Sequence, residues 1–190
     1  MLGSQQGIAR GHMTFTQTID QIVITQPRQP GSNGLINIKH RYFPCKIGKR
    51  GIGQKLCEGD GITPAGQWKM AYFLYRPDKI NKPHSLLKGF PVTPQDSWCD
   101  MPKSRRYNQP LSFTPENSSE PLWRSDNLYD VIIVLDHNSC PSISGKGSAI
   151  FIHICEPQTQ YTQGCIALNQ ANMLKLLRLS GPHTIVLNRR

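Results

Sequence analysis

Short runs of strand-forming residues, separated by turn residues, constrain this chain more than any other feature. The runs either alternate between apolar and polar positions or are wholly apolar, which is typical of half-buried and buried strands. They cover residues 19–25, 35–38, 68–75, 129–136, 148–155 and 184–187. One segment has helical spacing instead: Asn169 can cap it, apolar residues follow, and Gly181-Pro182 ends it. The pattern predicts a mostly β domain with one or two short helices.

The length of 190 residues is that of one domain with a sizeable core. Residues 1–12 carry no pattern and His12-Met13 is typical of a cloning junction, so we expect a vector-derived or disordered tail at 1–12 and a single domain at 13–190. Six cysteines occur without a C-x-x-C pair. They leave open either disulfides, which a core of this size does not need, or a reactive thiol.

A surplus of basic residues, 22 Lys and Arg against 12 Asp and Glu, gives a net charge of +10. Such a surface attracts polyanions: nucleic acid, acidic membranes or an anionic cell wall. The basic residues are scattered and no nucleic-acid-binding motif is visible, so we expect no nucleic-acid partner. No run approaches the roughly 20 apolar residues of a membrane span, and we see no secretory signal segment.

The stretch from residue 81 to residue 125 is rich in Pro, Asn and Ser and has no clean periodicity. Long irregular segments in compact domains are usually either functional or disordered. Because Trp98, Tyr107 and Trp123 punctuate this one, we interpret it as an ordered cover over the sheet.

Two residues near the end of the chain suggest nucleophilic catalysis. Strand periodicity places Ala149, Phe151, His153 and Cys155 on one face of the run 148–155. Cys165 follows Gly164 in a tight segment 12 residues after His153. The imidazole can raise the thiolate fraction, and the N–H groups of Gly164 and Cys165 can face an oxyanion. Taken alone, these residues also fit a core histidine and a structural cysteine.

Two segments there, Gly147-Ser148-Ala149-Ile150-Phe151-Ile152-His153 and Thr162-Gln163-Gly164-Cys165-Ile166-Ala167-Leu168, resemble the catalytic region of the YkuD-type L,D-transpeptidases. The resemblance covers roughly residues 34 to 187. It extends to Cys57-Glu58-Gly59-Asp60-Gly61-Ile62-Thr63-Pro64-Ala65-Gly66-Gln67-Trp68, Tyr75-Arg76-Pro77-Asp78, Trp98-Cys99-Asp100, Tyr107-Asn108, Leu122-Trp123-Arg124 and Leu128-Tyr129-Asp130.

The resemblance implies a YkuD-like curved sheet or β-sandwich in which Cys165 is the nucleophile, His153 the base and Gly164 part of the oxyanion site. A backbone carbonyl would orient the histidine. Cys165 would form a thioester with a peptidoglycan stem peptide, release D-alanine and pass the acyl group to an amine. We therefore expect a periplasmic or wall-facing monomer that needs no cofactor and no metal. The expected substrate-binding residues are Thr162, Gln163, Arg76, Trp98, Tyr107, Trp123 and Arg124.

The chain departs from many relatives, which carry Ser-His-Gly-Cys-hydrophobic-Arg at this place. Here Gln163 replaces the histidine and Ala167 the arginine. His153 must then be the base, and another cation such as Arg76, Arg124 or Lys146 must meet a substrate carboxylate.

Several alternatives stay open at the level of sequence. The same scaffold supports an L,D-carboxypeptidase or a peptidoglycan amidase, and a basic domain without catalysis can bind wall polymer. A zinc site using His153, Cys155 and Cys165 is a further reading, although no fourth ligand is apparent.

Overall fold

A computed structural model describes residues 18–27, 31–113 and 119–190. The tail expected at residues 1–12 lies outside these ranges. Fourteen strands and one helix are present in the described part of the chain. The strands are β1 (Gln21–Thr25), β2 (Asn33–Ile38), β3 (Arg41–Lys46), β4 (Ile52–Gly53), β5 (Thr63–Pro64), β6 (Gly66–Tyr75), β7 (Gly89–Pro91), β8 (Ser97–Trp98), β9 (Pro110–Leu111), β10 (Glu120–Pro121), β11 (Val131–Leu135), β12 (Phe151–Ile154), β13 (Ile166–Leu168) and β14 (Ile185–Arg189).

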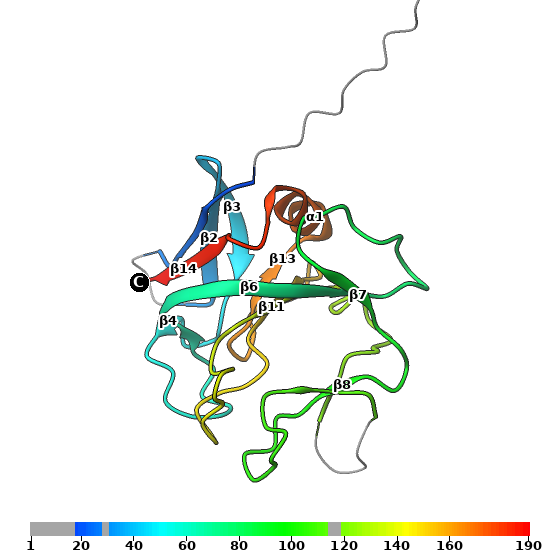
Figure 1. Cartoon of the computed structure of the whole chain (residues 1–190). Coiled ribbons are helices and arrows are strands. Elements are labelled where there is room, and N and C mark those ends of the chain that lie inside the picture. Colours follow the sequence, from blue (N-terminus) through cyan, green and yellow to red (C-terminus); the bar gives the residue numbers. More distant parts are fainter. Residues whose placement is uncertain (1–17, 28–30, 114–118) are drawn as a thin grey trace, which may run out of the picture.

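The main sheet has the strand order β11-β12-β13-β3-β2-β1-β14-β6-β7. It closes on itself because β6 also pairs with β11. The ten residues of β6 make this closure: Gly66–Lys69 pair with β14, and Met70–Tyr75 pair with β11. In Figure 1, β6 therefore runs across the whole molecule. The expected mostly β architecture with a curved sheet is confirmed.

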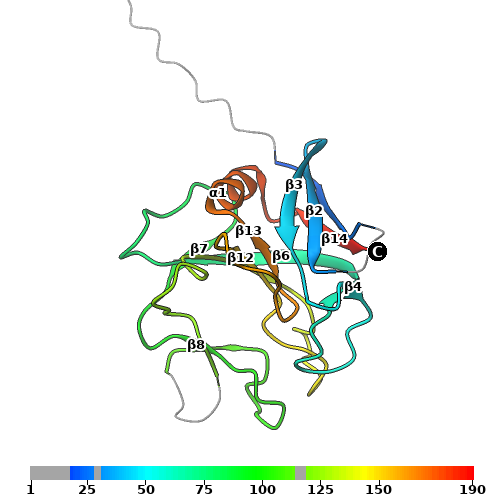
Figure 2. The same ribbon diagram turned by 180° about the vertical axis from the view of Figure 1, so that it is seen from behind.

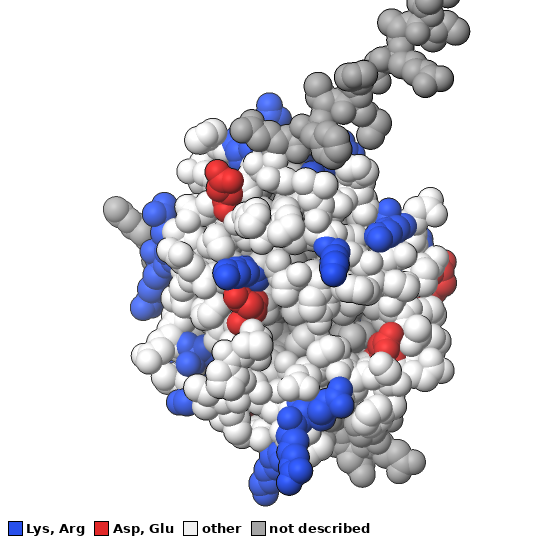
Figure 3. Space-filling view, in the orientation of Figure 1, with Lys and Arg blue, Asp and Glu red and all other residues white. Residues whose placement is uncertain are grey.

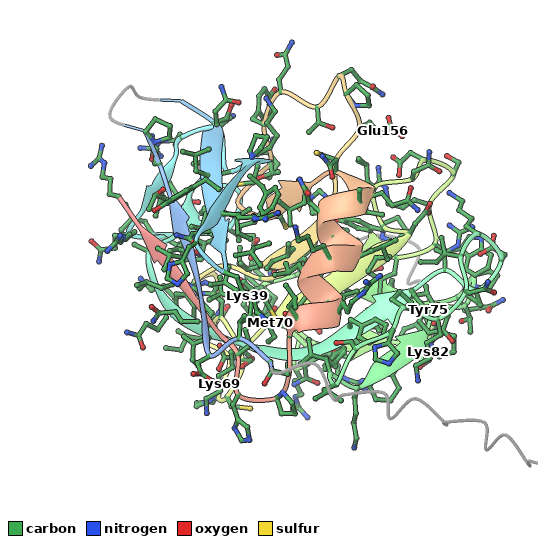
Figure 4. All side chains as sticks on the ribbon, turned by 90° about the horizontal axis from the view of Figure 1, so that it is seen from above. Lys39, Lys69, Met70, Tyr75, Lys82 and Glu156 are labelled. Atoms are coloured by element: carbon green, nitrogen blue, oxygen red, sulfur yellow. The ribbon has the colours of Figure 1, made fainter. Side chains whose placement is uncertain are left out.

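The single helix of the described residues is α1 (Gln170–Leu179). The Asn169 side chain accepts a hydrogen bond from the Asn172 N–H, as the sequence predicts for a cap. Met173, Leu176 and Leu177 are buried in the larger core cluster. Figure 4 looks down on this helix and labels Met70, a β6 residue of the same cluster.

The strand β12 separates two hydrophobic clusters. Ile152 and Ile154 belong to the larger cluster, whereas Phe151 belongs to a second one with residues of β11 and Trp98. This alternation confirms the expected period of two. The strand ends at Ile154, however, so the expectation that Cys155 shares the face of His153 is wrong: Cys155 lines a different cavity, together with Cys45.

The segment 81–125 is ordered over its described parts and forms a small sheet in the order β10-β8-β9. Trp98 packs edge-on against Phe151, with ring centroids 5.0 Å apart, so this segment covers one face of β12. Seen from both sides, β8 lies beside the main sheet (Figure 1, Figure 2). The interpretation as an ordered cover agrees with this packing.

The surface charges are scattered, as the sequence indicates, and the structure leaves the cysteines unpaired. Figure 3 shows Lys and Arg dispersed over one face rather than gathered in one patch. All six cysteines are free. No helix in the described ranges is long and apolar enough to cross a membrane.

Candidate active site

Cys165 lies immediately before β13, which pairs in parallel with β12. In that register Ile152 faces Ile166 and His153 faces Ala167, so the thiol comes to lie beside Phe151. The Cys165 Sγ accepts the Phe151 N–H at 3.5 Å and donates to the Ala149 carbonyl at 3.1 Å. The sulfur is thus held as a thiol between the strand and the bend that precedes it.

His153 lies on β12 and is 6% exposed. Its Nδ1 is 2.8 Å from the Ile154 carbonyl. Because a carbonyl only accepts hydrogen bonds, we assign the ring proton to Nδ1, which leaves Nε2 free to accept a proton. The Tyr129 ring lies edge-on to the imidazole at 5.3 Å and fixes its plane from the side. The backbone carbonyl therefore orients an imidazole that can accept a proton at Nε2.

One cavity of about 430 Å³ exposes both residues. Its walls come from five parts of the chain: 55–59, 100, 120–129, 148–153 and 159–165. They include Lys55, Glu58 and Gly59; Asp100, Glu120 and Arg124; Leu128, Tyr129, Ser148, Ala149, Ile150 and His153; and Thr159, Tyr161, Thr162, Gln163 and Cys165. A substrate in this cavity meets the thiol and the imidazole together.

Burial dominates the electrostatics of the pair. It lowers the pKa of His153 to about 4, against a smaller opposing effect of the Ile154 carbonyl. Burial, followed by the nearby Glu120 carboxylate, raises the pKa of Cys165 to about 12. At neutral pH the resting pair is then thiol and neutral imidazole rather than thiolate and imidazolium. A thiol in such a pair can act as a nucleophile if the imidazole takes its proton, which is the arrangement of general-base catalysis.

The turn before Cys165 requires glycine. Gly164 has φ +141°, and a Cβ there would lie 2.9 Å from the Ile62 carbonyl oxygen. The Thr162 hydroxyl accepts the Gly164 N–H at 3.2 Å and donates to the Cys165 carbonyl at 2.6 Å. The Gly164 N–H, expected to face an oxyanion, is therefore used by Thr162 in this structure.

The bend Gly147-Ser148-Ala149 forms the opposite wall. Ala149 has φ +52°, an uncommon conformation for a residue with a Cβ. Its N–H donates to Asn108 Oδ1 at 3.0 Å, and the same oxygen accepts the Trp98 indole N–H at 3.0 Å. Asn108 thereby holds the carbonyl that receives the Cys165 thiol.

A second set of contacts holds the start of this bend. The Tyr107 hydroxyl accepts the Gly147 N–H at 3.0 Å and itself donates to Glu58. Glu58 also accepts the Ser148 hydroxyl at 2.9 Å. The sequence segments at 57–60, 98–100 and 107–108 thus support one wall of the cavity.

The comparison with family models decides the family. Residues 32–187 match the YkuD model, described as the L,D-transpeptidase catalytic domain. The chain belongs to this family. The comparison with curated proteins found no match.

Within this YkuD domain, the expected substrate-binding residues separate into two groups. Thr162, Gln163 and Arg124 line the cavity. Four others lie outside its walls: Arg76, Trp98, Tyr107 and Trp123.

Arg76 illustrates why the second group has packing contacts instead. Its guanidinium is buried, makes two hydrogen bonds to Asp78, donates to the Arg124 carbonyl at 2.5 Å, and lies 3.7 Å from the Trp123 ring centroid. Trp98 and Tyr107 are buried as well. Lys146, a further cation considered from the sequence, also does not line the cavity.

The cavity residues that sequence reasoning missed include Lys55, Glu120 and Tyr129, whose ring also contacts His153. Tyr129 lay in a segment that matched the family, but no spacing argument connected it to His153. Glu120 and Lys55 come from short strands and loops without periodicity, which gave no signal. Within the described ranges no group of three or more His, Cys, Asp or Glu side chains is arranged to hold a metal ion.

Proposed function

We propose that this YkuD domain is a peptidoglycan L,D-transpeptidase that uses Cys165 as nucleophile and His153 as general base. The observation that supports it best is that both side chains open into one cavity, with the Nδ1 of His153 committed to the Ile154 carbonyl. This arrangement leaves the Nε2 lone pair as the proton acceptor of the site.

The first half-reaction acylates the enzyme. The Cys165 sulfur attacks the carbonyl carbon of the amide between the L-centre of diaminopimelate and D-alanine while His153 takes the thiol proton. The carbonyl oxygen becomes an oxyanion, and collapse of this intermediate breaks the C–N bond. The imidazolium returns its proton to the departing D-alanine nitrogen, and a thioester remains on Cys165.

The second half-reaction reverses these roles. The amine of a second stem attacks the thioester, His153 removes a proton from the attacking nitrogen, and the Cys165 sulfur leaves as a thiol. The product is a cross-link between two stems. If water replaces the amine, the product is a trimmed stem, which is the carboxypeptidase outcome.

The cavity walls support a charged peptide substrate. Arg124 lies at the cavity with its side chain about one third exposed, and it is the candidate for contact with a substrate carboxylate in place of the arginine replaced by Ala167. Glu58, Asp100 and Glu120 line the same cavity and suit the amino groups of a stem. Thr162 and Gln163 add neutral hydrogen-bonding groups beside the thiol.

A peptidoglycan substrate lies outside the cytoplasmic membrane, so the proposal includes a periplasmic or wall-facing location. Fractionation of the native host is expected to recover the protein with the periplasm or the wall. Recovery only from the cytosol would contradict a peptidoglycan substrate.

The products formed from muropeptides distinguish the proposed transpeptidase reaction from the alternative reactions. The purified protein is incubated with stem tetrapeptide muropeptides, and the products are analysed by mass spectrometry. Cross-linked dimers that lack one D-alanine are expected. Tripeptide monomers alone would identify a carboxypeptidase, cleavage of the sugar–peptide amide an amidase, and unchanged muropeptides a binding domain.

A further inference from the structure

Lys55 is a buried cation at the wall of the catalytic cavity. Its Nζ lies 2.7 Å from Asp60 Oδ1, and both side chains are 3% exposed. Lysine is seldom buried to this extent, because removing an ammonium from water is costly even in an ion pair. Asp60 also accepts the N–H groups of Leu56 at 2.8 Å and Ile62 at 2.9 Å. The carboxylate therefore accepts hydrogen bonds from backbone N–H groups as well. Satisfying its oxygens does not by itself explain why a lysine is buried here.

The path of the Lys55 side chain passes two glycines of the active site. A Cβ at Gly147 would lie 2.3 Å from Lys55 Cε, and a Cβ at Gly164 would lie 3.4 Å from Lys55 Nζ. The ammonium also lies 3.5 Å from the Ile62 carbonyl, which the Gly164 backbone approaches closely. The charge is therefore placed against the residue that precedes the nucleophile.

Lys55 differs in charge or placement from the other ionisable groups around the thiol. Burial and then Glu120 raise the pKa of Cys165, whereas the Phe151 N–H and, more weakly, Lys55 lower it. His153 is neutral, since burial lowers its pKa to about 4, and burial raises the pKa of Tyr129 so that its hydroxyl stays protonated. Arg124, the other cation of the described cavity wall, is paired with Asp126, as Lys55 is with Asp60, but its guanidinium lies over the Tyr129 ring. Both cations are thus ion-paired, and Lys55 is the one whose ammonium lies against Gly164, the residue before the sulfur.

We propose that Lys55 takes part in the reaction as an electrostatic residue: its ammonium stabilises the negative charge that develops on Cys165 and on the substrate oxyanion beside the Gly164 turn. The inference rests on the proposed function for the oxyanion and deepens it. Lys55 transfers no proton in this role. It supplies a donor and a positive charge where the Gly164 N–H is already bonded to Thr162.

Two substitutions test this role because they predict opposite signs. Lys55→Met removes the cation and leaves Asp60 uncompensated, so the thiolate becomes less favourable. Asp60→Asn removes the anion and leaves the cation, so the thiolate becomes more favourable. Lys175→Met is the matched control, because it removes one positive charge from α1 at a side chain that does not line the cavity.

The measurement is the rate at which iodoacetamide alkylates Cys165 at pH 8.5, followed by mass spectrometry of the peptide that contains it. Below the pKa of a thiol, one pKa unit changes the thiolate fraction tenfold. Lys55→Met is expected to slow alkylation about three- to tenfold, Asp60→Asn to accelerate it, and Lys175→Met to leave it within about twofold. A structural ion pair predicts instead that Lys55→Met and Asp60→Asn change the rate in the same direction, and that result would overturn the proposal.

Two further readouts keep the test decisive. If Lys55→Met does not keep the circular dichroism spectrum of the wild type, Lys55→Gln is used in its place. A slower or unchanged alkylation rate in Asp60→Asn overturns the proposal by itself. Alkylation needs no peptidoglycan. If Lys55→Met slows alkylation and Asp60→Asn accelerates it, while the wild-type protein leaves muropeptides unchanged, the proposed function is refuted. The effect of Lys55 on the thiol then still stands.

Discussion

The buried neutral His153 predicts a specific dependence of stability on pH. Its pKa of about 4 in the folded protein lies below the ordinary value of 6.5. Between these values the unfolded chain binds the proton and the folded protein does not, so the unfolded state gains stability as the pH falls. The contribution of neutral His153 is present above about pH 6.5 and is lost progressively toward pH 4.

The magnitude follows from the same two pKa values. Integration of proton binding between pH 7.5 and pH 4.5 gives a loss of about 2–3 kcal/mol of unfolding free energy from this one group. That is a large part of the total for a typical domain, which is about 5–15 kcal/mol.

The assay compares urea unfolding of the wild type and His153→Asn at both pH values. Other groups titrate in both proteins, including His137, whose pKa burial also lowers. Subtracting the two proteins therefore isolates His153. The wild type is expected to lose about 2–3 kcal/mol more than His153→Asn on acidification. Equal losses in both proteins would refute a buried neutral imidazole, and with it the general-base assignment.

The remaining predictions concern the thiol, the turn and the base. Cys165→Ala should abolish turnover and keep the far-ultraviolet circular dichroism spectrum, whereas Cys57→Ala, at an exposed cysteine, should retain turnover; native turnover in Cys165→Ala would remove the thiol from the mechanism. Gly164→Ala should lower the unfolding free energy more than Gly145→Ala, because both glycines have positive φ but only Gly164 approaches a carbonyl. The expected loss for Gly164→Ala, measured by urea titration, is about 1–3 kcal/mol. Equal losses in the two variants would contradict the contact. His153→Asn should slow acylation on the order of 10² to 10⁴, measured as thioester formation by rapid quench, and a near-native rate would exclude it as base.

The sequence predicted most of the main sheet because its strands are long enough to show periodicity. The segments around β1, β2, β6, β11, β12 and β14 were all recognised. The three residues of β13 are too few for a pattern. β3 contains Pro44 and is largely exposed, so neither burial nor alternation marked it.

The site residues likewise divide into those that the sequence predicted and those that it did not. His153 and Cys165 were found because each belongs to a local segment with a chemical signature, and parallel pairing of β12 with β13 brings the segments together. Lys55 and Glu120 reach the cavity through tertiary packing alone. Cys155 was misplaced because strand periodicity was extended one residue beyond the end of β12 at Ile154.

The most direct test of the account is the mass of the protein during turnover. The wild type is mixed with a stem tetrapeptide muropeptide, quenched in acid within one turnover and digested for peptide mass spectrometry. The expected result is a thioester on Cys165 with the mass of the stem minus D-alanine, no such adduct in Cys165→Ala, and much slower formation in His153→Asn. An adduct on another cysteine, or cross-linked product formed at the native rate by Cys165→Ala, would contradict it.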